Sequence, residues 1–229
     1  MNFWDDLYRN FIYDDRWLLL LKGLGVTLEI TFFAIILGTV LGVTLALMRL
    51  SKTRVLKVRI FERLATFYIT IIRGTPTMVQ LLLIYYVVFA AIDVDKVIVA
   101  IIAFGLNSAA YVAEIIRAGI LAVDRGQMEA GRSLGLSYSK TMLHIIMPQA
   151  VKNILPAYTS EFIVLIKETA IVGYISLNDL TRAGDFIRSR TFSALLPLLA
   201  VAVVYLLLTS LLAKLFGLLE RRMRKSDLR

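Results

Sequence analysis

Long apolar segments recur along this chain, and they limit its fold more than any other feature. An α-helix needs about 20 mostly apolar residues to cross roughly 30 Å of bilayer hydrocarbon. Five segments reach that length, at residues 17–48, 64–91, 97–119, 151–175 and 193–219. The first is longer than one crossing requires, so we expect it to tilt or to extend beyond the membrane. The pattern predicts an all-α membrane protein with about five transmembrane helices, forming a single domain over residues 1–229.

The composition argues against several other classes of protein. Hydrophobic residues make up 59% of the chain, against about 45–50% in a typical soluble domain. The formal charge of +9 could suit nucleic acid, but the basic residues stand in short blocks beside the apolar segments, as in membrane proteins. There is no cysteine, and His144 is the only histidine, so neither a thiolate nor a histidine-cluster metal site can form within one chain. No glycine-rich phosphate loop with its lysine is present, which excludes ATP hydrolysis by that route.

The loops between the apolar segments alternate in charge. Lysine and arginine outnumber acidic residues in loops 49–63 and 117–152 and in the tail 214–229. Acidic residues prevail before the first segment and between the second and third. Because basic loops stay on the cytoplasmic side, the chain is expected to have its N-terminus outside and its C-terminus inside. The 117–152 loop is then cytoplasmic.

That loop contains a short polar segment rich in small residues. Asp124 followed by Gln127 is typical of a capping box, and Gly135 suits the left-handed residue that closes a helix. The enclosed helix would be about 15 Å long. The candidate contact residues are Glu129, Ala130, Gly131, Arg132, Ser133, Leu134 and Gly135, where the small side chains would let a partner approach the backbone and the charges would set its register. From composition alone, a helix resting on the membrane surface explains the same pattern equally well.

Linked motifs in this region resemble a known family. Glu129-Ala130, Gly135, and then Ile145 and Pro148 are similar to the EAA motif of membrane subunits of bacterial ABC importers. The sequence departs from that motif at Gly131, which replaces an alanine, and at Met147, which replaces a leucine. Segments 73–81, 110–120 and 161–169 resemble in particular the polar amino acid permeases of the histidine/glutamine/arginine type.

The resemblance implies a type I importer permease in the prokaryotic cell (inner) membrane. Such a permease pairs with a second copy or a close paralogue, and an extracytoplasmic solute-binding protein delivers its amino acid. Each loop helix would dock on a cytoplasmic ABC ATPase subunit, so that ATP-driven closure swings the spans from inward- to outward-facing. ATP and Mg²⁺ would bind to that partner, whereas this chain would bind no cofactor, catalyse no covalent chemistry and contact only lipid, substrate and protein.

Polar residues from three spans reach a similar depth in the membrane. Thr77, Asn107 and Glu161 each lie near the middle of their segment, beside the break made by Gly74-Thr75-Pro76. Polar groups at this depth usually face a bundle interior or a water-filled cavity. The candidate substrate-binding residues are therefore Glu161, Asn107, Thr77, Gln80, Tyr111, Glu114, Arg73 and Thr75. Hydrogen bonding between helices, without any ligand, is the alternative for this set, and Arg73 could instead pair with Glu168.

Two other functions compete with an importer subunit. A stand-alone secondary transporter or channel would act without an ATPase, and a sensor or scaffold would transport nothing. The glutamates within the spans outnumber Arg73, which favours a cationic substrate such as arginine, lysine or histidine, while glutamine and other polar amino acids stay open.

Overall fold

The computed structural model describes residues 2–50 and 59–224, and within those ranges the protein is helical, with no strand. The helices are α1 (Phe3–Leu7), α2 (Trp17–Leu50), α3 (Ile60–Gly74), α4 (Thr77–Leu83), α5 (Lys96–Leu121), α6 (Arg125–Ser133), α7 (Tyr138–Thr141), α8 (Met147–Glu168), α9 (Leu180–Thr191) and α10 (Leu195–Arg224). π-helical turns follow α1, α4 and α7, and 3₁₀ turns cover Tyr13–Asp15 and Thr169–Ile175. The prediction of an all-α membrane protein is confirmed.

The described helices match the predicted spans unevenly. By length and apolar composition α2, α5 and α10 can each cross a membrane, and α3 with α4 can form one more, broken span. α8 begins slightly before the predicted fourth span and gives way to a 3₁₀ turn after Glu168, and its composition is too polar for the same test. Five crossings therefore stay a prediction.

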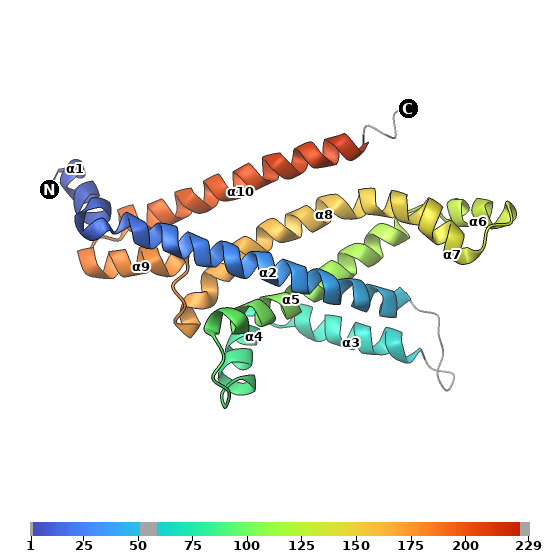
Figure 1. Cartoon of the computed structure of the whole chain (residues 1–229), viewed down its shortest axis with the longest axis horizontal. Coiled ribbons are helices and arrows are strands. Elements are labelled where there is room, and N and C mark those ends of the chain that lie inside the picture. The colour runs from blue at the N-terminus through green and yellow to red at the C-terminus, as the bar shows by residue number, and fades with distance from the viewer. Residues whose placement is uncertain (1, 51–58, 225–229) are drawn as a thin grey trace.

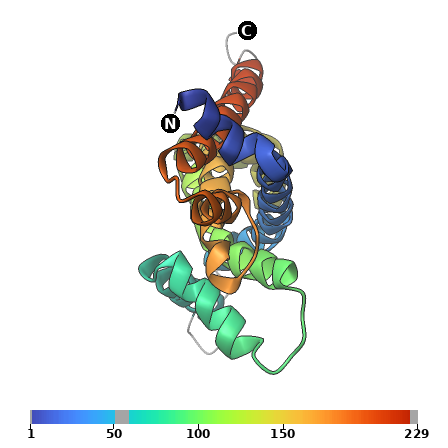
Figure 2. The same ribbon diagram turned by 90° about the vertical axis from the view of Figure 1, so that its left-hand side faces the viewer.

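The long helices run side by side along the molecule (Figure 1). At one end, α6 and α7 extend beyond the other helices, next to the carboxyl end of α2 and the start of α3; we call this the α6 end. The N-terminus and α9 lie at the opposite end, the α9 end. In the end-on view the α3–α4 pair lies to one side of the other helices (Figure 2). The basic loop 117–152 thus gathers at the end opposite the N-terminus, although which end faces the cytoplasm stays a prediction.

Small residues bring α2 and α5 into close contact. A Cβ atom added to Gly42 would lie 2.7 Å from Cγ1 of Val112, closer than packed atoms allow, and one added to Gly38 would lie 3.0 Å from Cβ of Ser108. The core around this contact includes Ile30, Phe104 and Leu165. By contrast α10 packs mainly against α8 and α9 and exposes many leucines. In a bilayer, such an apolar surface faces lipid.

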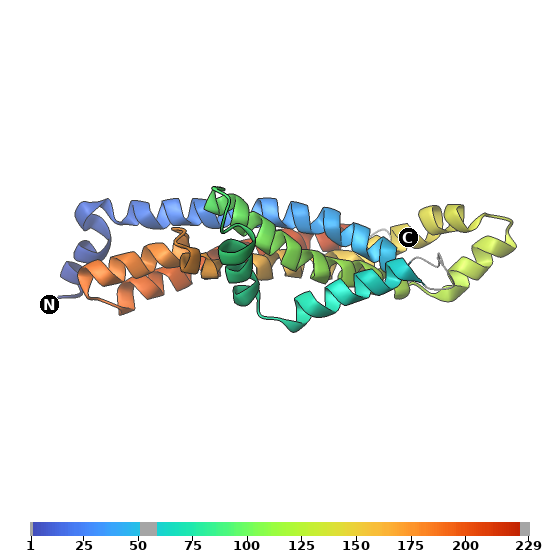
Figure 3. The same ribbon diagram turned by 90° about the horizontal axis from the view of Figure 1, so that it is seen from below.

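The break between α3 and α4 follows from its sequence. Thr75 is extended, with φ −123° and ψ 146°, because a residue that precedes proline is driven out of the helical region. Pro76 then starts α4 in a new direction, and the two helices meet at 106° (Figure 3). The break frees carbonyl groups at the end of α3 that need other donors.

Candidate functional site

The broken span is held by one buried side chain, Gln80. Its Nε2 donates to the carbonyl oxygen of Ile72 at 2.8 Å and to Oγ1 of Thr75 at 2.7 Å, and it lies 3.1 Å from the carbonyl oxygen of Thr75. These acceptors belong to the last turn of α3 and to the residue that follows it. Gln80 therefore replaces helical hydrogen bonds that the break removes, so its amide group is already engaged within the bundle.

Asn107, on α5, joins this group and leaves one acceptor free. Its Nδ2 donates to Oε1 of Gln80 at 2.8 Å and lies 3.5 Å from Oγ1 of Thr77. The side chain is buried, with 1% of its surface exposed, and its Oδ1 accepts no hydrogen bond from the described residues. An unpaired buried acceptor costs about 1–3 kcal/mol, so this oxygen is a ready acceptor for a ligand donor.

Glu161, on α8, presents a second free acceptor beside Asn107. Its Oε1 accepts a hydrogen bond from Oγ of Ser108 at 3.0 Å, and Ser108 directly follows Asn107. Glu161 forms no ion pair with any residue that the structure describes. A carboxylate without an ion pair and an amide oxygen without a donor, among the described residues, thus lie close together on two facing helices. Ser108 is not among the predicted site residues, although a serine next to Asn107 in an apolar helix is a usable signal.

Glu114 has a different environment from Glu161. It forms ion pairs with Arg49, from the end of α2, and with Arg117, three residues further along α5. Its carboxylate is therefore compensated by two guanidinium groups. Arg117 could have been found from its helical spacing, whereas Arg49 lies 65 residues away and only the packing of α2 on α5 brings it here.

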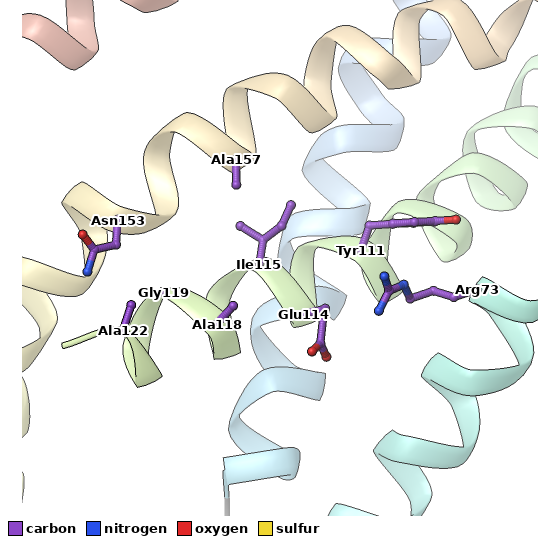
Figure 4. Close-up of a pocket in the computed structure, with 9 residues that line it drawn as sticks. All are labelled: Arg73, Tyr111, Glu114, Ile115, Ala118, Gly119, Ala122, Asn153 and Ala157. Carbon is purple, nitrogen blue, oxygen red and sulfur yellow. The ribbon is translucent and has the colours of Figure 1, made fainter. Parts of the chain in front are cut away.

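Arg73 and Tyr111 line a pocket that begins one turn beyond Asn107. The pocket has a volume of about 350 Å³ and lies between α5 and α8 (Figure 4). Its lining residues are Arg73, Tyr111, Glu114, Ile115, Ala118, Gly119, Ala122, Asn153 and Ala157. The guanidinium carbon of Arg73 lies 5.3 Å from the ring centroid of Tyr111, and Arg73 pairs with no carboxylate among the described residues. The alternative pairing of Arg73 with Glu168 is not formed among the residues that the structure describes.

The eight predicted substrate residues thus fall into two neighbouring groups. Thr75, Thr77, Gln80 and Asn107 form a hydrogen-bonded chain, with Glu161 next to it through Ser108. Tyr111, Glu114 and Arg73 line the adjoining pocket. Their contact with a substrate stays a prediction.

The loop helix at the α6 end forms largely as its sequence predicts. Asp124 caps α6 by accepting from the backbone N–H of Gly126 at 2.6 Å, and Gly135 closes the helix in the left-handed conformation, with φ +84°. The full capping box does not form, because the side chain of Gln127 reaches Gln149 at 3.4 Å instead of returning to Asp124. Ser137 caps the second helix, α7, because its Oγ accepts a hydrogen bond from the backbone N–H of Lys140 at 3.3 Å.

One residue of the predicted contact surface, Gly131, is not exposed. Gly131 is buried, and a Cβ atom there would lie 2.5 Å from Cγ2 of Thr141 on α7. Its lack of a side chain serves the packing of α6 on α7, so a partner cannot approach the backbone at this residue. The same contact explains why glycine replaces the alanine of the motif. The other six residues, Glu129, Ala130, Arg132, Ser133, Leu134 and Gly135, are exposed, and Leu134 exposes 80% of its surface.

Comparisons with known proteins extend over most of the chain. Residues 38–225 match the family described as binding-protein-dependent transport system inner membrane component. The arginine transport system permease protein ArtQ of Bacillus subtilis (strain 168) is 40% identical over 210 residues, which cover 91% of this chain and 94% of ArtQ. The L-cystine transport system permease protein TcyB of the same organism is 36% identical over 223 residues, which cover 96% of this chain and 91% of TcyB.

Solved structures give a parallel result. A chain from a crystal structure of an amino acid ABC transporter with histidines aligns with a TM-score of 0.82 and 45% identity, covering 89% of this chain and 94% of that one. An inward-facing structure of the MetNI methionine ABC transporter aligns with a TM-score of 0.76 over 90% of this chain and 96% of that one. At 20% identity, the latter likeness shows a shared fold alone.

Proposed function

The chain belongs to the family of binding-protein-dependent transport system inner membrane components, and from this membership we infer that it is the permease subunit of an amino acid ABC importer. It is a multi-pass membrane protein that carries out transport and no covalent chemistry. Its relatives ArtQ and TcyB are named as permeases for arginine and L-cystine, which supports an amino acid as the substrate. The large shared coverage supports the same role for the whole chain.

A polar amino acid, and a basic one in particular, fits the site at Asn107 and Glu161. The observation that carries this assignment is the pair of uncompensated acceptors, Oδ1 of Asn107 and the carboxylate of Glu161. An ammonium or guanidinium group donates several hydrogen bonds, and its positive charge would pair with the carboxylate of Glu161. Glu114 is a weaker candidate for this role because Arg49 and Arg117 already compensate it.

The exposed residues of α6 are the contact surface for an ABC ATPase subunit. Five small, charged or apolar side chains are exposed on α6 and directly after it, together with Gly135, and this short capped helix extends beyond the other helices (Figure 1). Leu134, directly after α6, offers this partner a large exposed apolar side chain. ATP and Mg²⁺ bind to that partner, a second permease copy or paralogue completes the membrane unit, and an extracytoplasmic solute-binding protein delivers the amino acid.

Reconstitution tests this function directly. The chain is co-expressed with its ATPase subunit and placed in proteoliposomes with a solute-binding protein for amino acids. We expect uptake of labelled arginine or histidine only when ATP is supplied on the ATPase side. Uptake driven by an ion gradient without the ATPase would instead make the chain a stand-alone secondary transporter.

A further inference from the structure

A second group of arginines lies at the α9 end, far from the site. The N-terminal segment folds back across this end before α2 begins at Trp17 (Figures 1 and 2). It is fixed there by Asn10, which is fully buried and whose Oδ1 accepts a hydrogen bond from Oγ1 of Thr191 at 2.8 Å. Nδ2 of Asn10 also donates to the carbonyl oxygen of Asp6 at 2.7 Å. The segment is thus docked on α9.

This docking forms a basic pocket of about 290 Å³. Its lining residues are Tyr8, Arg9, Tyr13, Arg16 and Arg190. Arg9 donates to the carbonyl oxygen of Thr191, and Arg16 donates to that of Arg9 at 2.7 Å, so both guanidinium groups are held in place by backbone. No carboxylate lines the pocket, and the ion pair that its arginines form within the described residues joins Arg16 to Asp14, whose side chain is 66% exposed. The lining thus holds three arginines and no carboxylate, while Asp5, Asp6, Asp14 and Asp15 belong to the same N-terminal segment outside the lining.

The surroundings of the pocket place it at the membrane surface. Phe192 exposes 92% of its surface although its backbone is left-handed, with φ 55°, which is a strained conformation for a bulky residue. Trp4 and Leu195 are also largely exposed. Exposed aromatic residues next to apolar spans gather at the level of the lipid headgroups. Arg16 immediately precedes α2, and Arg190 precedes α10 by five residues, so the pocket lies where two apolar helices begin.

We propose that this pocket binds the phosphate group of an anionic phospholipid in the leaflet at the α9 end. A guanidinium group presents a planar pair of N–H donors that matches two phosphate oxygens, and three arginines line this pocket together with two tyrosines. Phe192 and Leu195 supply apolar contact for the acyl chains beside the headgroup. An acidic protein surface would satisfy the charge but would leave these apolar side chains in water.

The chain offers its own probe for this site. Its only two tryptophans are Trp4, in the N-terminal segment, and Trp17, which begins α2 directly after Arg16 of the pocket. The full-length protein is placed in phosphatidylcholine nanodiscs that contain increasing fractions of brominated phosphatidylglycerol, and quenching of tryptophan fluorescence is measured. We expect stronger quenching than with the same fraction of brominated phosphatidylcholine.

Substitutions then locate the site. Arg190 stacks on Phe186 and makes no ion pair or hydrogen bond with the described residues, so Arg190→Gln should leave the fold intact. It should lower the apparent affinity for brominated phosphatidylglycerol about tenfold, by removing a charge-assisted contact. Arg190→Lys should give a smaller loss. The matched control is Arg188→Gln, since Arg188 pairs with Asp185 outside the pocket and its loss should change nothing.

Several results would overturn the proposal. Equal quenching by the two brominated lipids in the wild type would show that no anionic headgroup is selected. An equal loss in the Arg188→Gln and Arg190→Gln variants would show a general effect of surface charge. Relief of quenching by millimolar glycerol phosphate would assign the pocket to a soluble phosphate compound. Weaker binding of the solute-binding protein to Arg190→Gln, without lipid selectivity, would make the partner a protein.

Discussion

Two glutamates on facing helices, Glu114 and Glu161, differ in the charged groups around their carboxylates. Glu114 lies between Arg49 and Arg117, whereas Glu161 accepts one hydrogen bond from Ser108 and pairs with no described cation. Removing one member of a compensated pair mainly disturbs structure, because it leaves the partner charge unsatisfied. Removing a free carboxylate mainly affects whatever binds to it. Glu161 is therefore the residue at which a binding experiment is most informative.

We expect Glu161→Gln to weaken binding of a basic amino acid by roughly ten- to a hundredfold, because charge-assisted hydrogen bonds contribute about 1.5–3 kcal/mol. Titration calorimetry on the purified complex measures this loss. Assembly with the ATPase and basal ATP hydrolysis should change little, since α6 is remote from the site (Figure 1). Unchanged affinity for arginine, lysine and histidine would show that Glu161 does not contact the substrate.

Asp179 gives a pH-dependent prediction outside the spans. Its carboxylate caps α9 by accepting from the backbone N–H groups of Thr181 and Arg182, each at 3.0 Å, and burial raises its pKa although these bonds oppose the shift. A raised pKa means that the folded state binds the proton more tightly than the unfolded state. The stability from this group is complete below the ordinary value of about 4 and is lost as the pH rises through the raised value.

Asp179→Asn keeps a capping oxygen and removes the buried charge. We therefore expect the stability of this variant, relative to the wild type, to increase as the pH rises from about 4 towards neutrality. Asp179→Ala should instead cost about 1 kcal/mol through loss of the cap. Thermal unfolding in detergent across this pH range measures both. A wild type and Asn variant that differ by a constant amount at every pH would contradict the assignment.

At the level of elements, α6 and α7 form a rigid pair through a contact without room for a methyl group. Gly131 meets Thr141 there, and Gly135 closes the turn that joins the helices. The N–H of Leu136 also donates to the carbonyl oxygen of Gly131 at 3.1 Å, which fixes the carboxyl end of α6. If α6 docks on an ATPase subunit as we propose, its exposed face would transmit force only while this pair stays together.

Gly131→Ala should therefore loosen α6 from α7 and lower the ratio of substrate transported to ATP hydrolysed in the reconstituted complex. The added Cβ would lie 2.5 Å from Cγ2 of Thr141. Thr141→Ser removes that methyl group and keeps the hydroxyl that donates to the carbonyl oxygen of Ser137, so the double variant should recover part of the coupling. A normal ratio of transport to ATP hydrolysis in the Gly131→Ala variant would show that the contact does not matter for coupling. The same conclusion would follow if Thr141→Ser restored none of the lost ratio.

At the level of the whole molecule, the helices place unlike surfaces at the two ends. The α6 end carries the basic loop and the ATPase surface that we propose, and the α9 end carries the docked N-terminal segment and its basic pocket. Apolar side chains on α2 and α10 cover the sides between them. Because the two ends differ, the two possible orientations in the membrane can be told apart by labelling.

We predict that the N-terminus is outside and the α6 end is cytoplasmic. The chain has no cysteine, so single cysteines give clean labelling. In intact cells, Asp93→Cys should react with an impermeant thiol reagent, because it lies in the exposed loop before α5, whereas Ser139→Cys on α7 should react only after the membrane is opened. The opposite pattern would reverse the orientation and exclude docking of α6 on a cytoplasmic ATPase.

By itself the sequence determined the features that depend on residues close together in the chain. The length of the apolar segments predicts membrane helices, Thr75-Pro76 predicts the break, and Gly135 predicts the closing turn, because each follows from local backbone or solvation energies. The shared depth of Thr77, Asn107 and Glu161 was also predictable, since depth is counted along a helix.

Only the tertiary structure decided what each of these side chains touches. The packing of α5 against α2 brings Arg49 to Glu114, and the packing of α8 brings Glu161 to Ser108 and leaves it without an ion pair among the described residues. The return of α7 onto α6 buries Gly131, which the sequence alone had placed on the contact surface. Helix faces meet according to how all their side chains pack together, and no local stretch of sequence contains that information.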